Sequence, residues 1–346
     1  MNIRDIDIIL NTPADWNRLK DSTVLVTGAT GRLGMYFVHA LNEANRRWGL
    51  GIRILALARN TKKIEELYGD MGEGITFFPQ DVTQPITCSE EVDYIIHTAG
   101  LASPADFTSR PVETLWGHVM GTRNVLELAR TNGTKKVLYT STVEVYGDWK
   151  KDEYIKETDM GPLIHRNSRA CYQEAKRLCE TMLECYRVEH GVNFVTVNMS
   201  HTFGPGISLT DGRAFAEFIR NVLEGQDIVL QTDGSAVRTY TYVADAVGAM
   251  FLAMLNGEDS YYNIAATDNQ ISVRDMAYMI AGIDPNHKVK VLFANQEKQK
   301  LLYLPFKLGI LDSSRIMALG WKPQVDTETA FRWTLESFLE TGDKRK

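Results

Sequence analysis

The sequence predicts an α/β fold in which a doubly wound parallel sheet is covered on both faces by helices. Short, almost wholly apolar runs alternate with longer amphipathic stretches between residues 22 and 198. Strands that are buried on both faces give continuous apolar runs of this kind. Polar and glycine-rich residues follow the ends of these runs, which is where parallel sheets bind ligands.

The elements can be assigned in chain order from these patterns. Residues 1–21 form a short helical lead-in, and residues 23–26 are the first strand, followed by a glycine turn and a helix over residues 35–45. Five further strands are expected at residues 52–58, 75–78, 92–97, 137–140 and 193–198.

The character of the sequence changes after residue 198. Helices are expected at residues 212–223, 245–255 and 273–281, and short strands at 228–231 and 238–243. We therefore divide the chain into a lead-in (1–21), a dinucleotide-binding domain (22–198) and a small mixed C-terminal lobe (199–346) that is interleaved with the end of the main sheet.

A glycine-rich turn connects the first strand to the first helix. Its spacing, Gly28-x-x-Gly31-x-x-Gly34, permits a tight turn and a close approach of the backbone to a pyrophosphate at a helix N-terminus. This context, rather than the glycines alone, predicts a Rossmann-type dinucleotide site. The cofactor-binding residues expected in the turn are Gly28, Thr30, Gly31, Arg32, Leu33 and Gly34.

The ends of later strands complete the expected cofactor site. An acidic residue after the second strand binds a free ribose hydroxyl, whereas an arginine suits a 2′-phosphate. This chain has Arg59 there, which on physical grounds leans toward NADP, although an arginine also stacks on adenine. The expected cofactor is NAD, with NADP as the alternative that Arg59 leaves open. Asp81 and Val82 are expected to cover the adenine, and Ala99 follows the fourth strand.

Composition excludes several classes of protein. The net charge of −6 and the lack of a basic stripe argue against a nucleic-acid binder. No apolar run approaches the length of a membrane span, and the N-terminus lacks the pattern of a signal peptide, so a cytoplasmic protein is expected. The four cysteines have no metal-ligand spacing, and no metal site is predicted.

Tyr172 and Lys176 are the strongest candidates for catalysis. On a helix, positions i and i+4 share a face, so the ammonium of Lys176 is expected beside Tyr172. A neighbouring cation lowers the pKa of a tyrosine from about 10. The resulting phenolate is a base that can take a hydroxyl proton while a nicotinamide accepts a hydride.

These motifs resemble those of the extended short-chain dehydrogenase/reductases that modify nucleotide sugars, the NAD-dependent epimerase/dehydratase family. Within that family the sequence is most similar to the UDP-glucuronate decarboxylases. The resemblance covers nearly the whole chain from Ser22 onward. It is carried by the glycine turn and by residues 102–104, 141–148, 169–177, 202–205, 211–213, 237–238, 240–245 and 319–323.

The resemblance implies a role for each matched residue. Tyr172, helped by Thr142, takes the proton from the sugar hydroxyl at carbon 4, and Lys176 holds the nicotinamide ribose. Glu144 moves a proton at carbon 5. The expected substrate-binding residues are Ser103, His201, Arg213 and Arg238, the two arginines on the nucleotide diphosphate. A nucleotide-sugar substrate and a homodimer formed through the helix of Tyr172, around Leu178, Met182 and Leu183, are also implied.

Val143 is the most informative departure from the family pattern. The 4,6-dehydratases carry an acid beside the glutamate, which protonates a leaving hydroxyl, and valine cannot donate a proton. Decarboxylation needs no such acid. A retained Glu144 counts mildly against simple 4-epimerases, which usually have a small residue there.

Three further departures, His118, Asn198 and His201, replace residues that are usual in the family and leave the substrate open. His201 is equally well explained as a substrate contact or as a hydrogen-bonded wall residue. The preferred function is decarboxylation of a nucleotide hexuronate, followed by 4,6-dehydration and epimerisation. A catalytically silent nucleotide-binding protein is the alternative from another class.

Overall fold

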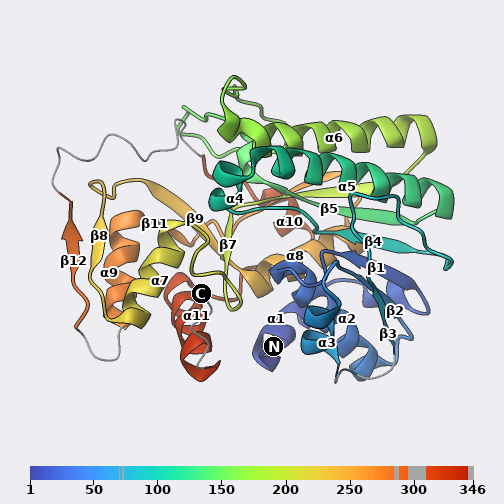
Figure 1. Cartoon of the computed structure of the whole chain (residues 1–346), viewed down its shortest axis with the longest axis horizontal. Coiled ribbons are helices and arrows are strands. Elements are labelled where there is room, and N and C mark those ends of the chain that lie inside the picture. The colour runs from blue at the N-terminus through green and yellow to red at the C-terminus, as the bar shows by residue number, and fades with distance from the viewer. Residues whose placement is uncertain (70, 72–73, 284–287, 295–308, 342–346) are drawn as a thin grey trace.

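The computed structural model describes residues 1–69, 71, 74–283, 288–294 and 309–341. Figure 1 shows a larger body built around a parallel sheet, on the right, and a smaller lobe on the left. Within the described residues, no helix combines the length and the apolar character that a bilayer span requires.

The main sheet has seven strands in the order β10-β6-β5-β4-β1-β2-β3, and all neighbouring pairs are parallel. The strand order reverses between β1 and β4, which is where open α/β sheets place their ligands. The strands are β1 (Thr23–Thr27), β2 (Arg53–Leu57), β3 (Ile75–Phe78), β4 (Tyr94–His97), β5 (Lys136–Thr142), β6 (Phe194–Met199) and β10 (Tyr261–Ile264).

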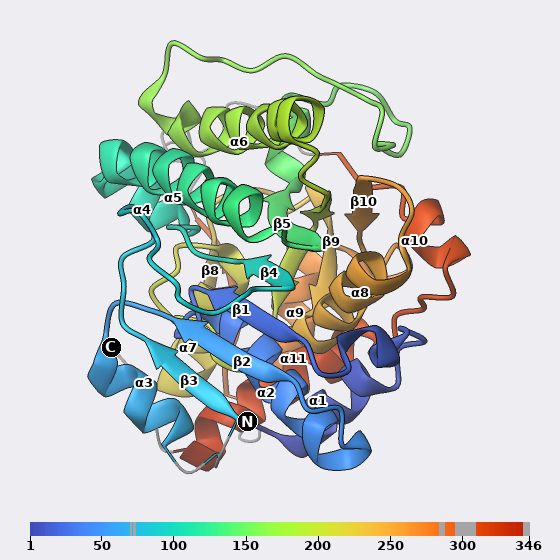
Figure 2. The same ribbon diagram turned by 90° about the vertical axis from the view of Figure 1, so that its right-hand side faces the viewer.

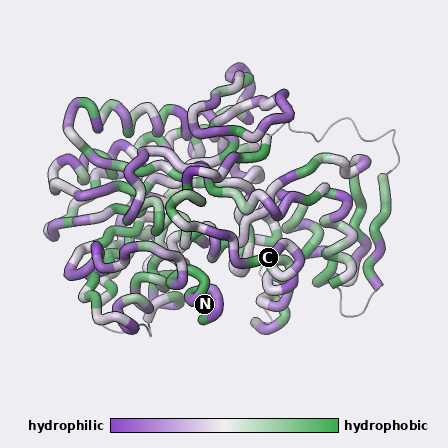
Figure 3. Tube along the Cα trace, turned by 180° about the vertical axis from the view of Figure 1, so that it is seen from behind, coloured by the Kyte–Doolittle hydropathy of each residue, from purple (hydrophilic) through white to green (hydrophobic). Residues whose placement is uncertain are grey.

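Alternate residues of each strand enter different cores. Val24 and Val26 of β1 join the larger core, whereas Leu25 between them joins a second core with Val125 and Leu183. This alternation follows from the two-residue period of a strand. Helices α1, α2, α3 and α8 cover the first face and α5 and α6 the second (Figure 2). In Figure 3 the tubes of the outer helices alternate between hydrophilic and hydrophobic colours, as expected of helices with one buried face.

Two helices of this body, α2 and α8, had predicted ranges beyond the lead-in, and each extends a few residues beyond its range at both ends. α2 ends at Gly49, which has a left-handed backbone conformation (φ 61°) and caps the helix, as glycine commonly does. The helices are α1 (Ile3–Leu10), α2 (Arg32–Trp48), α3 (Thr61–Tyr68), α4 (Pro104–Ser109), α5 (Pro111–Asn132), α6 (Cys171–His190) and α8 (Val243–Asn256), with the 3-10 turns η1 (Trp16–Leu19), η2 (Val143–Tyr146) and η3 (Ser168–Ala170).

The smaller lobe contains a mixed sheet of order β11-β9-β7 and a parallel pair β12-β8. β9 is antiparallel to β11 and parallel to β7. The elements are β7 (His201–Phe203), β8 (Ile228–Leu230), β9 (Val237–Tyr242), β11 (Gln270–Ser272), β12 (Val291–Phe293), α7 (Ala214–Glu224), α9 (Val273–Ile283), α10 (Ser314–Ala318) and α11 (Thr327–Thr341).

The lead-in helix α1 joins the two parts. The buried carboxylate of Asp5 accepts hydrogen bonds from Tyr36 of α2 and from Tyr242 of β9, both at 2.8 Å. The guanidinium of Arg4 lies 3.5 Å from the centre of the Trp333 ring of α11. One short helix therefore contacts elements of both the main body and the lobe.

The predicted fold class is confirmed, and the prediction missed four of the strands that the structure describes: β10 in the main sheet, and β7, β11 and β12 in the smaller lobe. β10 is a short run that follows α8 and pairs with β6 at the edge of the main sheet. One expectation about the surface is wrong: Leu183 is buried in the core against β5 and β6, so it is not available for a dimer contact. Leu178 is exposed on the same helix. The division into residues 1–21, 22–198 and 199–346 stays a prediction.

Candidate active site

Two cavities meet at the carboxyl ends of the strands, and Gly100 and Leu101 line both of them. The first, about 430 Å³, lies against the glycine turn and is called here the cofactor cleft. The second, about 330 Å³, is called the sugar cavity. Tyr172, Thr142 and Glu144 line the sugar cavity.

The glycine turn has the close packing that a dinucleotide loop requires. Gly28 has a φ of +69°, and a Cβ there would lie 2.9 Å from the backbone of Ala99. A Cβ on Gly34 would lie 2.3 Å from the carbonyl oxygen of Gly28. Gly31 caps α2 without a side chain, which leaves the amides at the start of the helix free to bind an anion. The turn therefore fits the diphosphate of a nicotinamide dinucleotide.

The cofactor cleft is lined by Gly28 and Thr30 of the glycine turn and, beyond the turn, by Arg59, Asp81 and Val82. The Nη1 of Arg59 lies 3.7 Å from an oxygen of Asp81. Burial acts to raise the pKa of Asp81, but hydrogen bonds from Thr83 and the charge of Arg59 hold it below its usual value. Asp81 therefore remains a hydrogen-bond acceptor at neutral pH, as the predicted contact with adenine requires.

Tyr172 and Lys176 are buried near the start of α6, with 7% and 4% of their surface exposed. The ammonium of Lys176 donates to the carbonyl oxygen of Thr140 at 2.7 Å and lies 5.9 Å from the centre of the Tyr172 ring. Burial lowers the pKa of Lys176 to about 8.

The expected lowering of the Tyr172 pKa is not found. Burial, with the nearby charge of Glu144, raises this pKa to about 12. The charge of Arg213 and the hydroxyl of Thr142 act in the opposite direction and are outweighed. Desolvation disfavours the phenolate more than the surrounding charges favour it.

Aromatic contacts fix the ring of Tyr172. It stacks on Phe107 of α4, with ring centres 4.3 Å apart, and meets the edge of His118 of α5 at 5.4 Å. His118 Nε2 donates to the carbonyl oxygen of Leu101 at 2.9 Å, and burial holds the pKa of His118 well below its usual value. The neutral histidine is thus a wall of the site.

Glu144 lies in the turn η2, directly after β5, where its amide donates to the Thr142 hydroxyl at 3.3 Å. Arg169 binds it from η3: its Nη2 lies 3.1 and 3.0 Å from the two carboxylate oxygens. The guanidinium of Arg169 also lies 4.7 Å from the centre of the Phe107 ring. Glu144 and Tyr172 are therefore held by one connected set of contacts.

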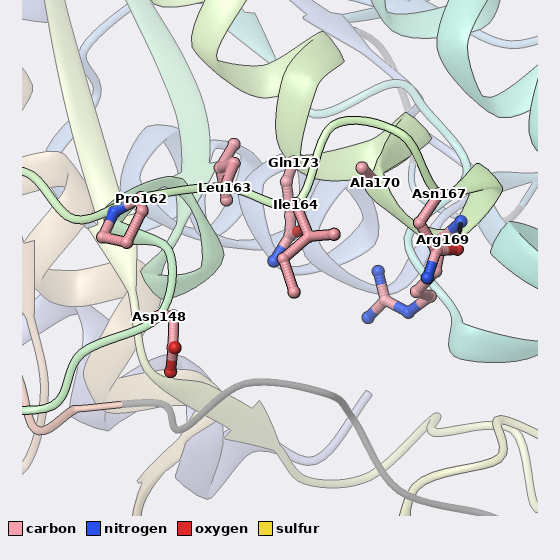
Figure 4. Close-up of a pocket in the computed structure, with 8 residues that line it drawn as sticks. All are labelled: Asp148, Pro162, Leu163, Ile164, Asn167, Arg169, Ala170 and Gln173. Atoms are coloured by element: carbon pink, nitrogen blue, oxygen red, sulfur yellow. Dashed lines mark hydrogen bonds between the residues drawn. The ribbon is translucent and has the colours of Figure 1, made fainter.

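The turn η2 contains no second acid, because its other residues are Val143, Val145 and Tyr146. Val143 is 6% exposed, packs with Val145 and Tyr146, and also lines the sugar cavity. Arg169 also lines a small cavity behind α6, about 10 Å³ in volume (Figure 4). That volume suits a single water molecule and no substrate group.

The other end of the sugar cavity is charged. Arg213, at the start of α7, donates to Asp211 at 3.1 Å and to the carbonyl oxygen of Ala102 at 2.6 Å. Arg32 lies in the glycine turn, and its guanidinium reaches β7, where it donates to the carbonyl oxygen of Thr202 at 2.8 Å. Ser103 caps α4 and donates to Asp106 at 2.7 Å.

Most of the predicted site residues line one of the two cavities, whereas Gly31, Gly34, Lys176 and Arg238 line neither. Leu33, Ser103, His201 and Arg213 line the sugar cavity, whereas Arg238 does not; its Nη1 donates to the carbonyl oxygen of Val237. Asn198 is buried and donates to the Tyr146 hydroxyl at 2.7 Å, outside the cavity lining. Burial, with the charges of Arg238 and Arg213, lowers the pKa of His201 to about 3, so it is neutral.

Three features of the site were not predicted. Arg169 was part of a matched stretch but had no role, and its position three residues before Tyr172 was the available signal. Arg32 lines the sugar cavity, although it was expected to bind the cofactor. Glu180, one turn after Lys176, accepts a hydrogen bond from Ser141 at 2.5 Å, and burial raises its pKa to about 7.

Comparison with known sequences supports the same assignment. The model of the NAD dependent epimerase/dehydratase family matches residues 24–265. UDP-glucuronic acid decarboxylase 6 of Arabidopsis thaliana is 30% identical over 340 residues, which cover 93% of this chain and 91% of that protein. UDP-glucuronic acid decarboxylase 1 of Xenopus tropicalis is 28% identical, with 91% of this chain and 72% of that protein covered.

Solved structures agree in fold. UDP-glucose 4-epimerase of Thermotoga maritima, in complex with UDP-glucose, superposes with a TM-score of 0.80 at 25% identity, covering 93% of this chain and all (100%) of that one. A dTDP-glucose 4,6-dehydratase of Streptomyces venezuelae gives a TM-score of 0.75 at 20% identity, with 92% and 97% covered. The predicted resemblance is confirmed: the chain belongs to the NAD-dependent epimerase/dehydratase family, whose members modify nucleotide sugars.

Proposed function

We propose that this enzyme decarboxylates a nucleotide hexuronate, UDP-glucuronate being the first candidate, by way of a transient ketone at carbon 4. The observation that carries the proposal is the pair Val143 and Glu144. Both side chains line the sugar cavity, so a carboxylate stands beside an apolar side chain that packs with Val145 and Tyr146 and cannot donate a proton. This arrangement suits a reaction that moves a proton at carbon 5 and expels carbon dioxide, because no leaving hydroxyl needs an acid.

The cofactor cleft would hold NAD through Gly28, Gly31, Gly34, Asp81 and Val82, and bound NAD supplies the hydride acceptor for carbon 4. Tyr172 takes the proton of the carbon 4 hydroxyl. Burial raises the pKa of Tyr172 to about 12, which disfavours the phenolate. The charge of Arg213 and the Thr142 hydroxyl act to lower this pKa and would stabilise the phenolate when Tyr172 acts as a base. Lys176 would hold the nicotinamide ribose.

A ketone at carbon 4 turns a carboxylate on carbon 5 into a β-keto acid. When the bond to the carboxylate breaks, its electron pair enters an enolate between carbons 4 and 5, and carbon dioxide leaves. A proton delivered to carbon 5 then restores the ketone. Carbon 4 would finally regain the hydride it gave up, and its oxygen would regain the proton held by Tyr172, so that no cofactor is consumed. Glu144, fixed by Arg169, is the residue in the cavity lining best suited to move that proton.

The test is incubation of the purified protein with UDP-glucuronate and NAD or NADP, followed by mass spectrometry and chromatography. Loss of carbon dioxide without net reduction of cofactor supports the decarboxylase. Loss of water from a nucleotide hexose would favour a dehydratase, and a new retention time at constant mass an epimerase. If no nucleotide sugar is changed and Tyr172→Phe alters no biological activity, the binding-protein alternative holds.

We also infer a homodimer formed through α6. Leu178 is exposed on this helix, and Met182 is only partly buried. Light scattering of wild-type protein and of Leu178→Glu tests this inference: a monomeric wild type would contradict it, and a dimer dissociated by the substitution would support it.

A further inference from the structure

The charged side chains that line the sugar cavity are paired, with one exception. Asp106 pairs with Arg110, Glu144 with Arg169, and Asp211 with Arg213. Arg32 also lines the cavity, but no carboxylate of the described residues lies within ion-pairing distance of it. Among the described residues that line the cavity, Arg32 is therefore the one charged side chain without an ion-pair partner.

The geometry of Arg32 leaves one edge of its guanidinium available. Nη2 donates to the carbonyl oxygen of Thr202 at 2.8 Å, which fixes the side chain, while Nη1 is enclosed and has no hydrogen-bond partner. Burial and the charge of Arg213 lower the pKa of Arg32 to about 10, against the effect of Asp211, so the group stays charged at neutral pH. An enclosed donor without a partner is costly unless a ligand satisfies it.

The position of Arg32 separates it from the two diphosphates expected in the site. The free amides at the start of α2 are suited to the diphosphate of the cofactor, whereas the Arg32 side chain extends away from the turn and contacts Thr202 of β7. Arg213 matches the position that binds the nucleotide diphosphate. The sugar itself is the remaining part of the ligand that can present anionic oxygens to Arg32.

We propose that the Arg32 guanidinium binds an anionic substituent of the sugar, such as the carboxylate of a hexuronate, and thereby selects acidic over neutral nucleotide sugars. This inference rests on the proposed function, of which it specifies the substrate class. The second oxygen of Asp211, Oδ1, is likewise enclosed and without a hydrogen-bond partner. A sugar hydroxyl can donate to it, so the cavity offers both a donor and an acceptor.

Calorimetric titration in a Tyr172→Phe background, where UDP-glucuronate is not consumed, tests the proposal. Arg32→Gln is expected to weaken UDP-glucuronate binding about tenfold or more, as for a charge-assisted hydrogen bond. Binding of UDP-glucose, UDP and NAD should change by less than about twofold. Arg32→Lys should retain part of the preference for the acidic sugar, and Arg46→Gln, an exposed arginine at the other end of α2, should have no effect.

Each other outcome has a defined meaning. If Arg32→Gln lost affinity equally for UDP-glucuronate, UDP-glucose and UDP, Arg32 would be assigned to the nucleotide diphosphate. If it lost affinity for NAD, Arg32 would be assigned to the cofactor. Either result overturns the proposal, and so does a wild type that binds UDP-glucuronate and UDP-glucose equally well. Thermal melts of each variant exclude unfolding as the cause. If the wild type binds UDP-glucuronate through Arg32 but releases no carbon dioxide, the proposed reaction fails and the inference stands. If it decarboxylates and Arg32→Gln keeps the full preference for UDP-glucuronate over UDP-glucose, only the inference fails.

Discussion

The cofactor cleft and the sugar cavity meet at Gly100 and Leu101 but are built in different ways. The anion-binding part of the cofactor cleft is made of backbone: three glycines and the start of α2, all within residues 28–34. The sugar cavity is made of side chains from segments far apart in the chain, among them Arg32, Glu144 and Arg213. A site made of backbone depends on local spacing, whereas one made of charged side chains depends on how distant segments meet.

The largest expected effect comes from the sugar cavity. Tyr172→Phe should lower kcat by about 10²–10⁴-fold, because it removes the proton acceptor. Affinity for the nucleotide sugar should change little, since the ring can still stack on Phe107. Steady-state kinetics and calorimetry measure the two quantities, with Tyr186→Phe on the same helix as the control. Turnover close to wild type would mean that another group takes the proton.

In the cofactor cleft, Gly34→Ala should weaken NAD binding without changing UDP-sugar binding. The added Cβ would lie 2.3 Å from the Gly28 carbonyl oxygen, and the turn cannot absorb such a contact without moving. Strain of about 1–3 kcal/mol corresponds to roughly a 5- to 150-fold loss of affinity. Gly282→Ala, where no atom lies within 4 Å of the added Cβ, is the control. If both ligands lost affinity equally, the two cavities would not be independent.

Arg169 and Glu144 test how much of the sugar cavity depends on paired charges. Arg169→Met leaves a largely buried carboxylate without its partner and should destabilise the protein by about 3 kcal/mol in urea unfolding. The double variant with Glu144→Gln should recover much of this loss, because it no longer buries an unpaired charge. The same substitution at Arg130, whose pair with Glu127 is exposed, should cost under about 1 kcal/mol. If the changes in unfolding free energy caused by Arg169→Met and Glu144→Gln simply added in the double variant, the two side chains would not stabilise each other.

The smallest functional effect is expected at Glu180, outside both cavities. Its pKa is raised from 4.5 to about 7. The stability that this carboxyl contributes is therefore fully present below pH 4.5 and is lost as the pH rises from 4.5 to about 7. Glu180→Gln should therefore stabilise the protein at pH 8, by on the order of 3 kcal/mol, and have little effect at pH 4.5. Urea unfolding at the two pH values measures the difference. A gain of the same size at both would refute the assignment.

The sequence predicted the cofactor cleft better than the sugar cavity, because the cleft is built largely from neighbouring residues and the cavity from segments far apart in the chain. The glycine spacing and the apolar strands are local patterns, and both were found where expected. Arg32 was assigned to the cofactor because its neighbours are, yet its side chain reaches β7, which lies far along the chain. Arg238 was assigned to the substrate by the resemblance, but it lies outside the cavity lining.

The prediction that the pKa of Tyr172 is lowered was wrong for a related reason. A spacing of four residues correctly placed Lys176 on the same face of α6, but spacing carries no information on burial. The structure adds the desolvation of Tyr172 and the charge of Glu144, which together outweigh the favourable neighbours. Likewise β10 was missed because its pairing with β6 depends on the return of the chain after α8.

The carboxylate of Asp5 also has a consequence for protein engineering. Its two oxygens accept hydrogen bonds from the hydroxyls of Tyr36 and Tyr242, so the first helix acts as a clasp between the main body and the smaller lobe. Chimeras that exchange the sugar lobe between relatives would have to carry both tyrosines and residues 3–10 as one module. A graft that ignored the clasp would leave a buried acid with half of its partners.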